Sequence, residues 1–194
     1  VAHLADGLQL LLPADLLAQA EHDIVAQPIL ATDSKELAQA VQTEIEKQLK
    51  VLETKETAEK SIENCGAIIL CDNIEQAAEA ANRKAPEHLE LAMDEGTTRD
   101  KIAELCHNYG SLFLGHGSAE VFGDYSAGLN HTLPTSGSAR FTGGLSVRVF
   151  LKTVTTLRTI PGSKGAVSSA KAAGHLGDAE GLAGHAHAAR LRLE

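Results

Sequence analysis

Two polar side chains near the start of the chain have the spacing of a ligand pair. Gln19 and His22 lie three residues apart in a stretch, residues 13–22, whose composition predicts a helix. Residues three apart share one face of a helix, so both side chains could hold one ion. Gln is a rare zinc ligand, and a single His on a helix is more often an ordinary polar residue. The pair alone therefore leaves a metal site and a plain polar surface both open.

A second pair combines a carboxylate with an imidazole. Glu87 and His88 directly follow Pro86. They offer two proton-transfer groups with different ordinary pKa ranges. Adjacent residues of a strand point to opposite faces, so both reach one site only if the backbone turns there, as Pro86 would allow. A surface loop with two polar residues explains the pair equally well.

A long polar region, residues 115–144, carries Asp124 and His131. Gly, Ser, Thr, Asn and His crowd together there without a helical period, and such a loop in a compact domain is usually functional or disordered. We expect it to follow a strand, and loops at the carboxyl ends of parallel strands commonly bind ligands. Near the end of the chain, His185 and His187 are either metal ligands or surface residues.

Composition excludes several classes of protein. The net charge of −9 argues against a nucleic-acid partner, because phosphate binding needs a basic surface. No apolar run is long enough to span a bilayer, so no membrane role is expected. The three cysteines are odd in number and lack Cys-x-x-Cys spacing, which predicts reduced thiols in a cytoplasmic protein.

The order of elements predicts an α/β fold. Short apolar runs at residues 29–32, 67–71 and 111–114 read as strands, residues 88–91 after Pro86 form a possible fourth strand, and helical stretches separate them. Strands that alternate with helices imply a parallel sheet. We therefore expect a Rossmann-like parallel sheet with helices on both faces in residues 1–145. Residues 146–194, which contain the Pro161-Gly162 break, should form a small helical C-terminal segment that needs a partner surface.

Seven short segments, in this order, resemble histidinol dehydrogenase. They are DLLAQAEH (15–22), APEHL (85–89), GSLFLG (110–115), GDY (123–125), GLNHTLPT (128–135), FLK (150–152) and EGLAGH (180–185). The resemblance is to the C-terminal part of that family and runs from about residue 14 to the end of the chain. It implies that the family's NAD contacts lie outside this sequence.

The resemblance assigns roles to particular residues. It implies zinc ligands at Gln19, His22, Asp124 and His185, and a catalytic acid/base pair at Glu87 and His88. Substrate contacts would come from the four zinc ligands and His88, together with His131 and Glu180. The implied reaction is the oxidation of histidinol through histidinal to histidine, with NAD as the electron acceptor. A homodimer is implied as well, in which His185 reaches the zinc of the partner subunit.

Two other functions remain open at this stage. A homologue of reduced length could bind zinc without catalysing any reaction. A zinc hydrolase on an α/β sheet could use Glu87 to activate water, which would need an open coordination position on the ion. NAD binding would separate the dehydrogenase from both alternatives, whereas the fold alone would not.

Overall fold

The computed structural model describes residues 8–193. The first seven residues of the predicted domain 1–145 and the last residue of the predicted segment 146–194 therefore lie outside the described residues. The chain divides into two compact units, residues 1–150 and 151–194. From sequence we placed the boundary at residue 145.

The helices and strands of the first unit are α1 (Leu8–Ala20), β1 (Ile29–Thr32), α2 (Lys35–Gln48), α3 (Lys55–Cys65), β2 (Ala67–Leu70), α4 (Ile74–Lys84), β3 (His88–Leu91), α5 (Thr97–Leu105), β4 (Ser111–Leu114) and α6 (Glu120–Tyr125). Two 3-10 turns, Ser138–Arg140 and Val147–Phe150, follow them.

All four strands pair in parallel, as expected for an α/β fold. β1 pairs with β2, where Ile29 lies opposite Ala67, and β3 pairs with β4, where His88 lies opposite Ser111. Among the described residues they form two separate two-stranded sheets, whereas we expected one sheet. Residues of β1 and β3 both line a cavity of about 850 Å³, so these strands face open space and are not joined by ladder hydrogen bonds.

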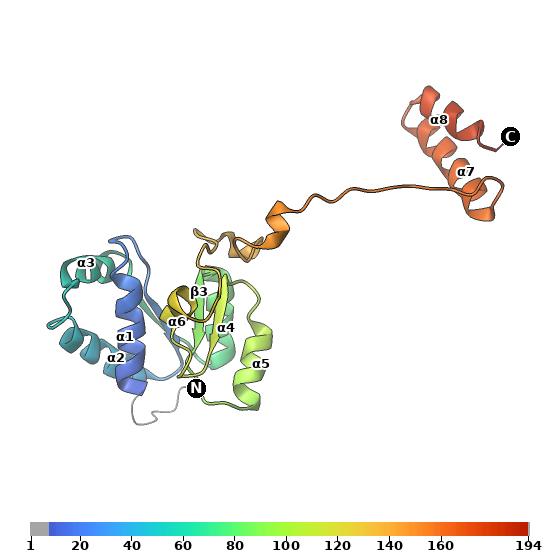
Figure 1. The fold of residues 1–194 in the computed structure, drawn as a ribbon. Coiled ribbons are helices and arrows are strands. Elements are labelled where there is room, and N and C mark those ends of the chain that lie inside the picture. The colour runs from blue at the N-terminus through green and yellow to red at the C-terminus, as the bar shows by residue number, and fades with distance from the viewer. Residues whose placement is uncertain (1–7, 194) are drawn as a thin grey trace. The chain divides into compact units, whose positions relative to one another are not determined.

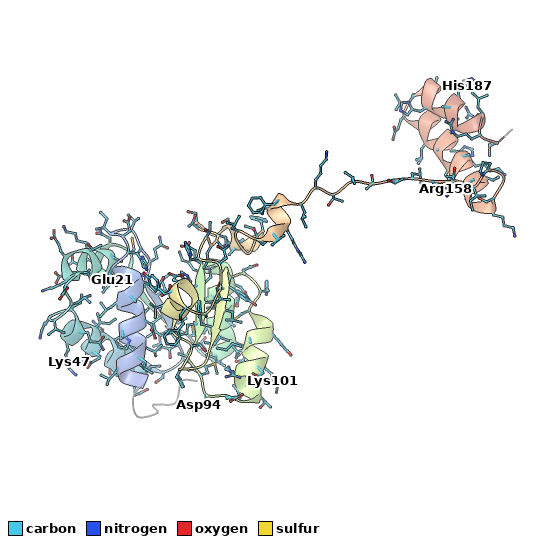
Figure 2. All side chains as sticks on the ribbon, in the orientation of Figure 1. Glu21, Lys47, Asp94, Lys101, Arg158 and His187 are labelled. Atoms are coloured by element: carbon cyan, nitrogen blue, oxygen red, sulfur yellow. The ribbon has the colours of Figure 1, made fainter. Side chains whose placement is uncertain are left out.

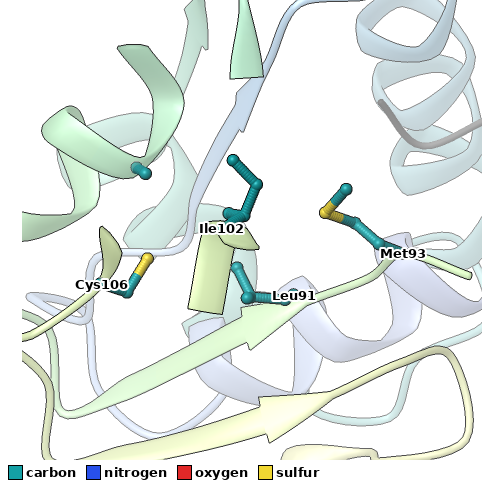
Figure 3. Close-up of a cluster of buried hydrophobic side chains, with 5 residues drawn as sticks. Leu91, Met93, Ile102 and Cys106 are labelled. Carbon is teal, nitrogen blue, oxygen red and sulfur yellow. The ribbon is translucent and has the colours of Figure 1, made fainter. Parts of the chain in front are cut away.

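Each strand pair has its own apolar core. The first core joins α1 and α2 to β1 through Leu12, Leu30, Leu37 and Val41. The second joins α4 and α5 to β3 and is built from Ala78, Leu91, Met93, Ile102 and Cys106 (Figure 3). Accordingly, α1, α2 and α3 gather on one side of the unit and α4 and α5 on the other (Figure 1).

Local sequence signals explain where several helices begin. The Ser34 hydroxyl accepts a hydrogen bond from the Leu37 backbone N–H at 3.1 Å and caps α2. The Asn73 side chain caps α4 in the same way. Helix α1 begins earlier than we expected, and Pro13 lies inside it rather than at its first turn. Charged side chains such as Lys47 and Lys101 point away from the first unit (Figure 2).

Strand β2 has little cover. Ile68, Ile69 and Leu70 are 41%, 38% and 55% exposed, although apolar strands of a parallel sheet are normally buried on both faces. The helices of the first unit therefore cover β1, β3 and β4 better than β2.

The second unit is a pair of helices, α7 (Lys164–Ala179) and α8 (Ala183–Arg190), which pack against each other. Gly177 permits the contact, because a Cβ atom there would lie 2.7 Å from the Ala186 backbone nitrogen. The preceding segment carries highly exposed apolar side chains, among them Val154 at 75% and Leu157 at 90%. In the part of the chain that the structure describes, no helix combines the length and apolarity needed to cross a membrane.

Candidate active site

The catalytic pair expected from sequence sits where β3 begins. Ala85 ends α4 in the left-handed conformation, with φ of 53°, and turns the chain into Pro86. Glu87 then precedes the strand, and His88 is its first residue. Gly110 lies against this point, because a Cβ atom there would be 2.6 Å from the Glu87 backbone oxygen. The backbone is therefore held tightly where the two proton-transfer groups emerge.

The end of α1 contributes Gln19 and the turn after it contributes His22, and the labelled Glu21 marks this place in Figure 2. Gln19 Oε1 lies 3.2 Å from His88 Nδ1. We expected both residues on one helix, but α1 ends at Ala20 and His22 lies in the turn that follows. His22 is exposed there, whereas Gln19 is half-buried.

Asp124 also occupies a different setting from the one expected. The region 115–144 was predicted as a loop, but residues 120–125 form the short helix α6. Gly123 allows this helix to lie close to the sheet, because a Cβ atom there would be 3.0 Å from the Phe113 ring. Glu120 and Asp124 are four residues apart and so share one face of the helix. That face is turned toward His88.

The acidic groups of α6 surround the imidazole of His88. Its Nε2 lies 3.4 Å from Glu120 Oε1 and 3.9 Å from Asp124 Oδ1. The ring also lies near that of Phe113, with ring centroids 5.9 Å apart and the two planes tilted by 48°. Gln19, Glu120, Asp124 and His88 thus meet at the amino end of β3. We expected a site at the carboxyl ends of the strands, but the chain returns along the sheet after β4, so that Pro134 packs beside Gly110.

The same groups could hold a metal ion. Ligand atoms of His22, Glu120 and Asp124 all lie within 4.8 Å of one another. Imidazole nitrogen and carboxylate oxygen are ordinary zinc ligands. Three buried polar atoms beside them have no hydrogen-bond partner within the described structure, namely Gln19 Nε2, His88 Nε2 and Glu120 Oε1. The Gln19 amide nitrogen can only donate hydrogen bonds, but the imidazole of His22 and the carboxylates of Glu120 and Asp124 fit a cation bound between them.

Burial shifts the pKa values of these groups. It lowers the pKa of His88, which favours the neutral imidazole. Burial raises the pKa of Glu87, and the nearby Asp124 carboxylate raises it further. Burial, with help from Asp124, raises the pKa of Glu120 to about 7. Burial also raises the pKa of Glu90 to about 8, and the charges of Asp15 and Glu120 add to this shift.

The remaining predicted residues lie elsewhere. His131 is exposed but lines the same cavity as Gln19, His22, Glu87, His88 and Asp124. Glu180 follows α7 and His185 lies on α8, so both belong to the second unit, where both are exposed. The structure therefore brings five of the predicted residues close together in the first unit and places His131 on the wall of that cavity.

Sequence reasoning missed three acidic residues of this cavity. Asp15, Glu90 and Glu120 all line it. Spacing offered a signal for each: Asp15 precedes Gln19 by one helical turn, Glu90 shares a strand face with His88, and Glu120 precedes Asp124 by four residues. The signal for Glu120 was hidden because the region did not read as helical.

Comparisons with known proteins identify the relatives of this chain. A model of the family described as histidinol dehydrogenase matches residues 8–193. The chain belongs to the histidinol dehydrogenase family. Histidinol dehydrogenases of Caldanaerobacter subterraneus subsp. tengcongensis and Streptococcus mutans are 49% and 47% identical to it, over 93% and 92% of this chain and 41% of each relative. The resemblance inferred from the short motifs is thereby confirmed.

A solved structure supports the same relationship. A crystal structure of histidinol dehydrogenase from Elizabethkingia anophelis matches 99% of this chain and 43% of its own chain, with a TM-score of 0.86 and 35% sequence identity. The α/β fold expected from sequence is confirmed by this match and by the parallel strands. The chain spans about two fifths of the length of these histidinol dehydrogenases.

Proposed function

We propose that this chain carries the substrate-oxidising site of a zinc-dependent histidinol dehydrogenase, which converts histidinol through histidinal to histidine with NAD as electron acceptor. The observation that carries the proposal is the contact of 3.2 Å between Gln19 Oε1 and His88 Nδ1. An amide oxygen only accepts hydrogen bonds, so this contact favours the tautomer of His88 that holds the ring proton on Nδ1. The lone pair is then on Nε2, the buried atom without a hydrogen-bond partner.

His88 is thereby prepared to act as a general base. Burial keeps its imidazole neutral by lowering its pKa. In the first oxidation, Nε2 takes the hydroxyl proton of histidinol while a hydride leaves its carbon for NAD, and histidinal forms. Proton transfer by a positioned side chain contributes on the order of 10²–10⁴ in rate.

Glu87 serves the second oxidation. Its carboxylate takes a proton from the water molecule that adds to the aldehyde carbon of histidinal, and the hydrate then loses a second hydride to NAD. Burial and the neighbouring Asp124 raise the pKa of Glu87, which strengthens the carboxylate as a base. Because Glu87 and His88 both line the same cavity, one substrate carbon can be served by both groups without leaving the site.

A zinc ion would be held by Gln19, His22 and Asp124, and when bound it would supply positive charge that orients the amine and imidazole nitrogens of the substrate. The carboxylate and imidazole donors support this assignment. His131 would contact the substrate from the wall of the cavity. We assign no NAD-contacting residue within the described part of the chain.

The second unit would act in a homodimer. Its exposed apolar linking segment, with Leu157 90% exposed, favours burial against another surface. We propose that this unit of one protomer brings Glu180 and His185 to the site of the other, as fits a cytoplasmic dimer with exchanged segments. Family membership also weighs against a zinc hydrolase, and no feature of the site favours that alternative.

The proposal is tested on the full-length protein that contains this chain, loaded with zinc. We expect His88→Asn to slow NADH formation from histidinol by about 10²–10⁴-fold. Glu87→Gln should block the second oxidation more than the first, so that histidinal accumulates and can be trapped with semicarbazide. His116→Asn is a matched control, because His116 is a half-buried histidine paired with Asp94 outside this site. Absence of NADH formation by the zinc-loaded wild-type protein would refute the proposal.

A further inference from the structure

Asn82 lies near the end of α4, and its side chain joins this helix to the loop between α5 and β4. Its Nδ2 atom donates a hydrogen bond to the Leu105 backbone oxygen at 2.8 Å. Its Oδ1 atom accepts hydrogen bonds from the backbone N–H groups of His107 and Asn108, at 2.8 and 3.2 Å. The Asn108 side chain in turn donates to the Asn82 backbone oxygen at 3.1 Å. Four hydrogen bonds thus fasten this loop to α4.

The partners of Asn82 require both ends of a side-chain amide. The Leu105 carbonyl is one of the last of α5, which lack partners within that helix, and it only accepts hydrogen bonds. The two backbone N–H groups of the loop only donate. Aspartate has the same length but would supply the acceptor alone, and alanine would supply neither. Asn82 therefore serves one acceptor and two donors with a single short side chain.

The fastened loop leads directly to the residues that hold Glu87. Gly110 and Ser111 donate backbone hydrogen bonds to the backbone oxygens of Pro86 and Glu87, at 3.0 and 2.8 Å. Glu87 lies just before β3, and Pro86 has no N–H group with which to anchor the chain. The place of the Glu87 backbone therefore depends on where the loop before Ser111 is held.

The imidazole of His88 has further supports. Its Nδ1 lies 3.2 Å from Gln19 Oε1 on α1, and its ring lies near that of Phe113 on β4. Contacts from two other elements thus hold this ring. A displacement of the loop between α5 and β4 should therefore move Glu87 more than it moves the imidazole of His88.

We propose that Asn82 is a positioning residue for Glu87, because it holds the loop from which Gly110 and Ser111 fix the backbone before β3. Among the described residues Asn82 does not line the cavity, so it acts through Glu87 and not on the substrate. The inference rests on the proposed function, since it concerns the oxidation of histidinal that we assign to Glu87. Asn82 also lies outside the short segments that resemble the family.

The test measures the two oxidations separately in the zinc-loaded full-length protein. Semicarbazide traps histidinal, so NADH formation from histidinol in its presence reports the first oxidation. NADH formation from added histidinal reports the second. We expect Asn82→Ala to slow the second oxidation at least about tenfold more than the first, since a misplacement of about 1 Å can cost on the order of 10²-fold in rate. Asn82→Asp keeps the acceptor for the two loop N–H groups and should show a smaller difference.

Gln76→Ala is the matched control. Gln76 is an exposed amide at the other end of α4, where its Oε1 accepts a hydrogen bond from the Asp72 backbone N–H at 2.7 Å. This variant should oxidise histidinol and histidinal at the wild-type rates. Urea unfolding gives the stability of each variant, because a loss of folded protein alone would lower both rates by the same factor.

The outcomes separate this inference from the proposed function. If Asn82→Ala slows both oxidations equally, or slows neither, the inference is wrong and the proposed function stands. If the wild-type protein oxidises neither histidinol nor histidinal, the proposed function fails and the inference fails with it. Should Asn82→Ala not fold, Asn82→Asp decides in its place. A greater loss in the second oxidation than in the first then supports the inference, and equal rates relative to the wild type overturn it.

Discussion

At the scale of single residues, the site depends on side chains that are costly to bury. Glu90 lies on the same strand as His88 and faces a cavity that also holds Asp15 and Glu120. Its pKa is raised to about 8, first by burial and then by these two carboxylates. A carboxyl group in such a position is protonated at neutral pH in the folded chain.

This protonation has a predictable effect on stability. The pKa of Glu90 is higher in the folded chain than its ordinary value of 4.5, so the folded chain holds an extra proton between these values. Glu90 therefore contributes its full stabilisation of the folded chain below pH 4.5, and this stabilisation is lost as the pH rises toward about 8. We expect Glu90→Gln to be more stable than the wild type at pH 8.5 by on the order of 2 kcal/mol, after solvent screening.

The measurement is urea unfolding of the metal-free chain at pH 5.5 and pH 8.5. Glu104→Gln serves as control, because its carboxylate is exposed. Equal pH dependence in Glu90→Gln and the wild type would show that Glu90 is ionised in the folded chain at neutral pH.

At the scale of elements, the pairing of β3 with β4 positions Glu87 and His88, the proposed catalytic pair. Gly110 and Ser111 donate backbone hydrogen bonds to Pro86 and Glu87 at 3.0 and 2.8 Å. A Cβ atom at Gly110 would lie 2.6 Å from the Glu87 backbone oxygen and 2.7 Å from Pro134 Cδ. The backbone cannot move aside there without breaking these bonds.

We therefore expect Gly110→Ala to destabilise the chain by about 1–3 kcal/mol, as overpacking does in other proteins. The change should also shift Glu87 and slow the second oxidation in the full-length protein. Gly117→Ala is the control, because a Cβ atom at Gly117 would meet nothing within 4 Å. Urea unfolding measures the stability of both variants. If Gly110→Ala and Gly117→Ala unfold at the same urea concentration, the backbone at Gly110 is less constrained than we infer.

At the scale of the whole molecule, the chain matches only part of its relatives' length. It covers 41% of two histidinol dehydrogenases, and its sequence contains no Gly-x-Gly-x-x-Gly motif of the kind that binds dinucleotides. We expect the 194-residue chain, by itself and with zinc, to form no NADH from histidinol. The full-length protein, assayed in parallel, provides the positive control. NADH formation by this chain alone would show that its own residues suffice for NAD binding.

The proposed exchange of segments between protomers can be tested by mixing. A full-length His185→Ala variant is combined with an inactive Glu87→Gln, His88→Gln variant. If His185 serves the partner's site, one site of each mixed dimer regains every wild-type group, and activity returns. Light scattering or tagged subunits establish that exchange has occurred. Continued inactivity of mixed dimers would mean that His185 acts within its own chain.

The sequence by itself determined the positions of the four strands and the family. Apolar runs marked β1, β2 and β4, since strands of a parallel sheet are often short continuous apolar stretches, and the position after Pro86 marked β3. The motifs around Gln19, Glu87, Asp124 and His131 indicated histidinol dehydrogenase, because such motifs consist of residues close together in the chain. These features depend on local order and composition, which a sequence states directly.

Only the tertiary structure decided how these pieces meet. The return of the chain along the sheet placed α6 beside His88, and this placement brought Glu120 into the site and moved the site to the amino end of β3. The strands formed two separate pairs, and residues of β1 and β3 line one cavity. Burial then raised the pKa values of Glu90 and Glu120. Such effects arise from contacts between residues distant in the chain, and neither spacing nor composition records which distant residues become neighbours.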